Sequence, residues 1–146
     1  MNKFTIAAAA MLLSAPAFAQ DATGDAAAGE KVFNQCQACH VVQNDAGEVL
    51  AGRNGKVGPN LYGLPGRKAG SVEGFRYGDS MVAAGEKGLN WDEEHFVKYV
   101  QDPTGFLREY LDDSSARGKM AFKLRKEEDA TNVWAYIASL SPAPSN

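Results

Sequence analysis

The sequence predicts an all-α fold of about five helices joined by long loops. Apolar residues recur at helical spacing near both ends: Gly29 and Phe33 share one face of residues 25–36, and the periodicity of residues 126–140 stops before Pro142. No series of β-branched, strand-like segments points to a substantial sheet. Because both amphipathic helices must bury an apolar side, we expect the first and last helices to pack against each other.

The helices between these two are shorter. A short helix is expected over residues 80–84, ended by Gly85. A stronger one begins at an N-cap on Asn90, carries acidic residues in its first turn and stops before Pro103. A further short segment, 105–110, precedes the last helix.

The stretch from residue 43 to residue 78 is predicted to be loop. It is rich in glycine and contains Pro59 and Pro65. A loop of this length is unusual in a small domain unless something else supplies a core. A large flat cofactor would do so.

The first 19 residues are predicted to be a cleaved signal peptide. One early lysine, Lys3, precedes an apolar run, and Ala17-Phe18-Ala19 has the small-x-small pattern of a cleavage site. A membrane anchor is the alternative, but the run is well short of the ~20 residues that span a bilayer. We therefore expect export to the periplasm, residues 20–146 as a single domain, and no stable membrane insertion.

The charge of the chain argues against general nucleic-acid binding. The formal net charge is -3, and cleavage would remove the single positive charge of Lys3 and leave -4. Proteins that bind nucleic acid usually carry a basic surface. We expect no nucleic-acid partner.

Cys36, Cys39 and His40 form a Cys-x-x-Cys-His motif that contains both cysteines of the chain. The spacing is typical of c-type haem attachment, in which each thiol adds to a vinyl group and the histidine binds the iron. A redox dithiol is the first alternative, although the surrounding sequence lacks the alternating strands and helices of a thioredoxin-like fold. A zinc site is the second, but only His95 remains as a further cysteine or histidine ligand of the mature chain.

Five segments, in order, resemble class I c-type cytochromes, and most closely the long type of bacterial cytochrome c2. They run over essentially the whole mature chain, and together they are far more specific than one Cys-x-x-Cys-His motif. The segments are GEKVFNQCQACH, VGPNLYGLPGRKAG, LNWDEEHFVKYVQDP, GKMAF and VWAYI. The resemblance implies the class I cytochrome c fold, wrapped around one covalently bound haem c.

The resemblance also implies the second axial ligand of the iron. By chemistry alone either mature methionine, Met81 or Met120, could bind it. The GKMAF segment resembles the family's ligand segment, so Met120 is the expected ligand and Met81 is expected to pack beside the haem. His95 is expected to be an exposed helix residue.

Five further residues match positions around the haem in the family. Pro59 resembles the proline whose carbonyl accepts a hydrogen bond from the ligand histidine and so orients it. Arg67, Tyr77 and Trp91 resemble residues that contact the haem propionates, and Tyr99 resembles the tyrosine beside the methionine sulfur.

Gly29, Phe33 and Tyr136 resemble the contact at which the first and last helices of the family cross. This contact has no electron-transfer chemistry, so these residues are expected to act on stability.

The function implied is that of a monomeric periplasmic one-electron carrier, not an enzyme. It would take electrons from a cytochrome bc complex and pass them to a photosynthetic reaction centre or a terminal oxidase. The alternatives are a haem peroxidase or gas-binding c-type cytochrome, which needs an open or displaceable sixth site, and a periplasmic dithiol oxidoreductase.

Docking to such partners is expected to use a basic ring. Steering by such a ring can raise association ~10- to 1,000-fold. The alternative is a mixed, solvated surface. The ring would comprise Lys56, Lys68, Lys87, Lys98, Lys119, Lys123, Arg125 and Lys126.

Overall fold

Residues 22–143, the part of the chain that this computed structural model describes, contain five helices and a two-stranded sheet joined by loops. The all-α class with about five helices is confirmed, and the predicted signal peptide lies outside the described residues. In chain order the elements are α1 (Ala26–Phe33), β1 (Val41–Gln43), β2 (Val49–Gly52), α2 (Asp79–Glu86), α3 (Glu93–Gln101), α4 (Pro103–Leu111) and α5 (Glu127–Leu140).

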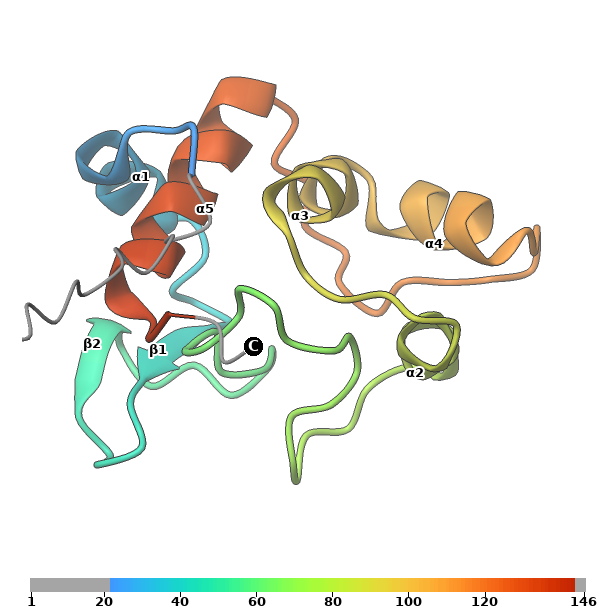
Figure 1. Cartoon of the computed structure of the whole chain (residues 1–146), viewed down its shortest axis with the longest axis horizontal. Helices are drawn as coiled ribbons and strands as arrows, with labels where there is room; N and C mark the ends of the chain where they lie inside the picture. The colour runs from blue at the N-terminus through green and yellow to red at the C-terminus, as the bar shows by residue number, and fades with distance from the viewer. Residues whose placement is uncertain (1–21, 144–146) are drawn as a thin grey trace, which may run out of the picture.

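The helices α1 and α5 cross at one end of the molecule, as the sequence predicted (Figure 1). Gly29 lies at the crossing, where a Cβ atom would overlap the carbonyl oxygen of Asn132. Beside it, the rings of Phe33 and Tyr136 meet edge to face with centroids 5.5 Å apart. The close approach of the two helices therefore depends on a residue without a side chain.

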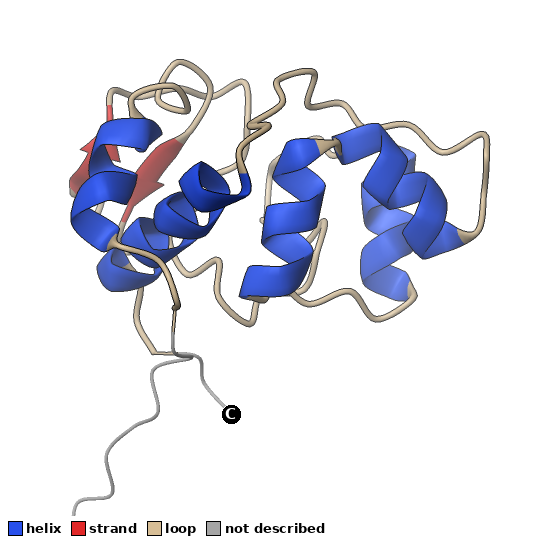
Figure 2. Cartoon of the chain, turned by 90° about the horizontal axis from the view of Figure 1, so that it is seen from above, coloured by secondary structure: helices blue, strands red, loops and turns tan. Residues whose placement is uncertain are grey.

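The helices α2, α3 and α4 lie on the other side of the molecule (Figure 2), and of these three α3 packs against α5. The contact between α3 and α5 includes Phe96 and Trp134, whose ring centroids are 5.3 Å apart. Trp134 is among the largest fully buried side chains. No helix among residues 22–143 is both long and apolar enough to cross a membrane.

The prediction that residues 43–78 are entirely loop is wrong at its start. Strands β1 and β2 form an antiparallel hairpin, with Val42 opposite Ala51 and an irregular register after Val42. Both of these side chains are buried. The hairpin was missed because its strands have only three and four residues, too few to show an alternating pattern.

Two helix boundaries also differ from prediction. Helix α2 does not end at Gly85 but continues through it. Gly85 is needed there because a side chain would overlap the carbonyl of Ala69, and the absence of one lets the helix lie against that loop. Helix α3 is capped by Asp92, whose carboxylate accepts the backbone N–H of His95, and Asn90 lies outside it. The short segment before the last helix is the full helix α4.

Candidate functional site

The two thiols and the imidazole of the Cys-x-x-Cys-His motif lie on one turn that extends α1. The N–H of Cys36 donates to the carbonyl of Phe33 at 2.8 Å, and the N–H of His40 donates to the carbonyl of Cys36 at 3.0 Å. Both cysteines are free and half-buried. Backbone hydrogen bonds of the chain itself therefore hold the motif in a helical turn.

The ring of His40 is fixed by the loop that follows the hairpin. Its Nδ1 lies 2.9 Å from the carbonyl oxygen of Pro59, which leaves Nε2 as the nitrogen available to a metal. A Cβ atom on Gly58 would overlap the same ring. Burial lowers the pKa of His40, and the neutral imidazole that results is the form that binds metals.

The environment of Cys36 is unlike that of a reactive dithiol. Burial, and to a smaller extent the charge of Cys39, raise the pKa of Cys36 to about 11. Catalytic dithiols instead depend on a thiol with a lowered pKa. Within residues 22–143, no group of three or more His, Cys, Asp or Glu side chains could hold a metal ion.

Arg67 and Trp91 are brought together through their backbones. The N–H of Trp91 donates to the carbonyl of Arg67 at 2.9 Å. The guanidinium of Arg67 donates to the carbonyls of Asn60 and Tyr62 at 3.0 and 3.1 Å, so it braces its own loop. Burial lowers the pKa of Arg67, though it remains a cation at neutral pH.

Tyr77 and Tyr99 are the two tyrosines that were also expected near the haem. The ring of Tyr99 meets that of Trp91 edge to face at 5.2 Å. The hydroxyl of Tyr77 accepts a long hydrogen bond of 3.4 Å from the N–H of Val72. Burial, with a smaller effect of Tyr77, raises the pKa of Tyr99 to about 12. Both hydroxyls can therefore act as hydrogen-bond donors at neutral pH.

Met120 lies in the segment between α4 and α5, half-buried against the hydrophobic core. Hydrogen bonds hold the residues before it: the N–H of Gly118 donates to Oγ1 of Thr104 at 3.1 Å, and Nζ of Lys119 donates to the carbonyl of Arg76 at 2.9 Å. Because Arg76 directly precedes Tyr77 in the chain, the segment that contains Met120 lies close to Tyr77.

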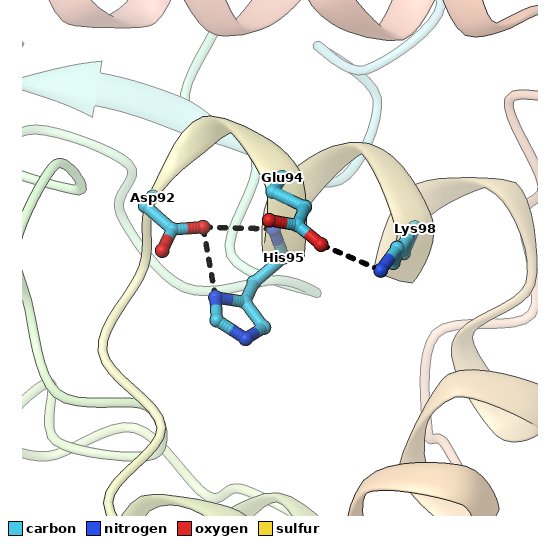
Figure 3. Close-up of polar contacts among 4 residues, drawn as sticks. All are labelled: Asp92, Glu94, His95 and Lys98. Carbon is cyan, nitrogen blue, oxygen red and sulfur yellow. Dashed lines mark hydrogen bonds and ion pairs between the residues drawn. The ribbon is translucent and has the colours of Figure 1, made fainter.

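The two residues expected to lie outside the ligand set differ in environment. Met81 is buried in α2 as part of the core. His95 is not simply exposed: its side chain is 35% exposed, and Nδ1 lies 2.8 Å from the carboxylate of Asp92 (Figure 3). The ring centroids of Phe106 and Tyr110 lie 6.1 and 6.0 Å from that of His95. His95 therefore packs between α3 and α4.

Two functional neighbours were missed by sequence reasoning. Gly58 gives His40 its space, and Asn60 joins the loop to the hairpin by accepting from the N–H of Gln43 at 3.0 Å and donating to its carbonyl at 2.8 Å. Both flank Pro59 in the run Gly-Pro-Asn. Their position beside Pro59 could have drawn attention to them, but they make their contacts with residues that lie far away in the sequence.

The eight basic side chains of the predicted docking ring are all exposed, but four of them have partners. Two form ion pairs, Lys98 with Glu94 (Figure 3) and Lys123 with Asp102. The other two donate to backbone carbonyls: Lys87 to that of Tyr110 and Lys119 to that of Arg76.

Relatives with known names match most of the chain, although no family model matches it. Cytochrome c2 of Rhodovulum adriaticum is 68% identical over 120 residues, covering 82% of this chain and 95% of the relative. Cytochrome c2 of Cereibacter sphaeroides is 57% identical over 140 residues, covering 95% of each. The solved structure of cytochrome c2 from Rhodobacter sphaeroides has a TM-score of 0.78 at 62% identity, covering 80% of this chain and 95% of that one.

The fold is therefore the class I cytochrome c fold. At these identities and coverages, the chain belongs to the cytochrome c2 family. It is an electron-transfer protein, not an enzyme, and its cofactor is one covalently bound haem c, for which Cys36 and Cys39 provide the attachment motif.

Proposed function

We propose that this chain is a soluble periplasmic one-electron carrier that takes electrons from a cytochrome bc complex and delivers them to a photosynthetic reaction centre or a terminal oxidase. The observation that carries the proposal is the turn from Cys36 to His40, with the histidine ring fixed against Pro59 at 2.9 Å. This arrangement fits a c-type haem, because it presents two thiols and one oriented imidazole nitrogen from one turn, residues 36–40.

Each side chain of the site has a defined role in the proposal. Cys36 and Cys39 would attach the porphyrin through thioether bonds, and His40 and Met120 would be the two protein ligands of the iron. When bound, haem iron supplies a one-electron couple between its ferrous and ferric states. With both axial ligands supplied by the protein, no open position would remain, which would suit electron transfer and oppose peroxidase or gas-binding chemistry.

The surrounding residues would set the strength of these ligands. Pro59 keeps the imidazole of His40 in one orientation and raises its basicity. Arg67, Tyr77 and Trp91 provide donors for the propionates, since a partly buried carboxylate needs hydrogen bonds or an opposite charge. Tyr99 is half-buried beside Trp91, and its hydroxyl is proposed to be the donor toward the methionine sulfur.

The potential of the carrier is expected to be high. Methionine is a weaker donor than imidazole and favours ferrous iron. A buried, largely apolar surround disfavours the additional charge of the ferric state. For a one-electron couple, ~59 mV corresponds to a tenfold change in the equilibrium, so the loss of one supporting hydrogen bond is measurable.

Residues 1–19 are proposed to be a cleaved signal peptide, and residues 20–146 the mature single domain. The Ala17-Phe18-Ala19 pattern supports this division. N-terminal sequencing of protein recovered from the periplasm should begin at Gln20. An uncleaved N-terminus in the membrane fraction would contradict it.

The ligand assignment is tested by replacing each mature methionine in turn, in protein made in haem-competent cells. Met120→Ala should abolish the methionine-to-ferric-iron absorption band, while the mass of covalently attached haem stays. Met81→Ala is the matched control and should keep the band, because Met81 lies in the core of α2. Loss of the band in Met81→Ala alone would reverse the assignment.

Two further measurements separate the alternatives. Rapid binding of carbon monoxide by the native ferrous protein would indicate a displaceable sixth ligand and argue against a simple carrier. Turnover of reaction-centre membranes and of oxidase-containing membranes, each supplied with the reduced protein, distinguishes the photosynthetic from the respiratory acceptor.

A further inference from the structure

The sequence contains a single asparagine that is followed by glycine, Asn54-Gly55. The pair lies just beyond the end of β2, and the side chain of Asn54 is exposed. Its backbone has a φ of 130°, a conformation that L residues rarely adopt. Within residues 22–143 neither the carboxamide of Asn54 nor the N–H of Gly55 forms a hydrogen bond. No hydrogen bond within the described residues therefore fixes either group.

We propose that Asn54 is a site of spontaneous deamidation. The backbone nitrogen of Gly55 attacks Cγ of Asn54; a N–Cγ bond forms, the bond from Cγ to Nδ2 breaks, and ammonia leaves with the proton that Gly55 loses. Water then opens the resulting succinimide at either carbonyl and yields an aspartyl or an isoaspartyl residue. No electrons are transferred. Asparagine is among the chemically labile residues, and glycine offers no Cβ to shield the attacking nitrogen.

The position makes the isoaspartyl product consequential. Gly55 lies directly against the haem-attachment turn: a Cβ atom placed on it would lie 2.7 Å from the carbonyl carbon of Cys39. Three residues further on, the N–H of Gly58 donates to the carbonyl of Cys39 at 2.8 Å. The carbonyl of the next residue, Pro59, is the hydrogen-bond partner of Nδ1 of His40. An isoaspartyl linkage inserts one extra backbone methylene at the start of this segment, whereas an aspartyl residue adds only a negative charge.

The modification itself does not depend on the proposed function. Its effect on the iron does, because that effect rests on His40 as the axial ligand. The two parts can fail separately, since the first is read from mass and chemistry and the second from the haem environment.

Asn44, in the turn of the same hairpin, is the matched comparison. Its Oδ1 accepts the N–H groups of Ala46 and Glu48 at 3.1 and 2.9 Å, and its Nδ2 donates to the carboxylate of Glu48 at 3.2 Å. It is half-buried and is followed by Asp45. Hydrogen bonds that fix the carboxamide oppose its reorientation toward a backbone nitrogen, so Asn44 should keep its amide under conditions in which Asn54 loses it.

The experiment follows the purified haem-loaded protein through incubation at mildly alkaline pH. Cleavage after glutamate separates residues 31–48 from residues 49–73, and fragmentation distinguishes Asn54 from Asn60 within the second peptide. Residue 54 should gain the mass of an amide-to-acid conversion and become a substrate for isoaspartyl methylation, while Asn44 stays unchanged. Asn54→Gln should suppress both signals. Equal conversion at residues 44 and 54, or none at residue 54, overturns the proposal.

The consequence for the haem is tested against Asn54→Asp, which carries the charge of one product without the extra methylene. The isoaspartyl fraction should show shifted ring resonances of His40 and a changed midpoint potential relative to Asn54→Asp. Identical spectra and potentials for the two would overturn the link to His40 while leaving the modification in place. Absence of covalent haem from the starting protein would instead count against the proposed function.

Discussion

Asp102 takes part in two interactions at the residue where α3 gives way to α4. One oxygen of its carboxylate lies 2.8 Å from Nζ of Lys123 and accepts the N–H of Gly105 at 3.3 Å as the N-cap of α4. Since Lys123 follows Met120 by three residues, the pair connects the expected ligand segment to the helices. Both partners are exposed, so the interaction is screened by salt and its contribution to stability is small.

The pH dependence of this contribution has a definite sign. The hydrogen bond that Asp102 accepts from Lys123, followed by the one from Gly105, lowers the pKa of Asp102 in the folded protein. A lowered folded-state pKa means that the contribution is present above the unfolded value, ~3.9, and is lost as pH falls through the folded one. The substitution Asp102→Asn isolates the charge, because the amide keeps an oxygen for the cap of α4.

Asp102→Asn should therefore be slightly less stable than the native protein at neutral pH and low salt, and equally stable below the folded pKa of Asp102. Denaturant unfolding of the haem-loaded protein at several pH values measures the difference. Lys123→Gln should give a smaller loss, because it removes only the ion pair, and the double variant should lose no more than Asp102→Asn alone. Additive losses would show that the two side chains do not interact.

The crossing of α1 and α5 allows a prediction at the scale of elements. In an exposed helix, glycine to alanine gains about 1 kcal/mol from helix propensity. At Gly29 the new methyl group would overlap the carbonyl of Asn132 and approach Cβ of Tyr136. Overpacking typically costs about 1–3 kcal/mol, and the obstacle here is backbone, which cannot rotate away. The steric cost should exceed the propensity gain.

Gly29→Ala is accordingly expected to lower the free energy of unfolding, measured by denaturant titration with an unchanged slope. Ala27→Gly, the reverse exchange at an exposed position in the first turn of α1, reports on propensity without the steric overlap and should lower it by no more than about 1 kcal/mol. A Gly29→Ala protein as stable as the native one would mean that the helices can separate at little cost.

What the sequence could predict differed between these elements for physical reasons. The crossing of α1 and α5 was predictable because both helices carry apolar periodicity and the resemblance paired Gly29 with Tyr136. The hairpin was not, because strands of three and four residues leave too short a pattern. The N-cap was predicted at Asn90 but lies at Asp92, and only the fold shows that the backbone of Asn90 instead bridges to that of Lys68.

The site divides in the same way. The turn from Cys36 to His40 is local, and haem chemistry fixes its spacing, so the sequence reveals it directly. The contact of Gly58 with His40, the link from Asn60 to Gln43, and the packing of His95 between two helices are made across long separations in sequence. Such contacts leave no periodic or spacing signal in a single chain.

For the whole molecule, the distribution of charge is more informative than its sum. The net charge is -3, yet eight basic side chains assigned to the docking ring are exposed. Four of them are held by partners within the described residues, which weakens their ability to attract another protein. The remaining four, Lys56, Lys68, Arg125 and Lys126, form no ion pair within residues 22–143 and are the better candidates for steering.

Lys68 is the most direct test of steering, because it lies next to Arg67 and its backbone pairs with that of Asn90 beside Trp91, close to the expected haem contacts. Lys68→Glu should slow electron exchange with the proposed partners, a cytochrome bc complex and an acceptor, several-fold at low ionic strength. The Debye length falls from ~30 Å at 0.01 M salt to ~10 Å at 0.1 M, so the effect should fade as salt is added.

The control for this experiment is Lys31→Glu, which makes the same change in net charge on α1, the helix that packs against α5. If steering acts through the surface around Lys68, only Lys68→Glu slows the reaction, and both variants keep the native midpoint potential. Equal slowing by the two variants would mean that total charge governs association, and the mixed, solvated surface would then be the correct description.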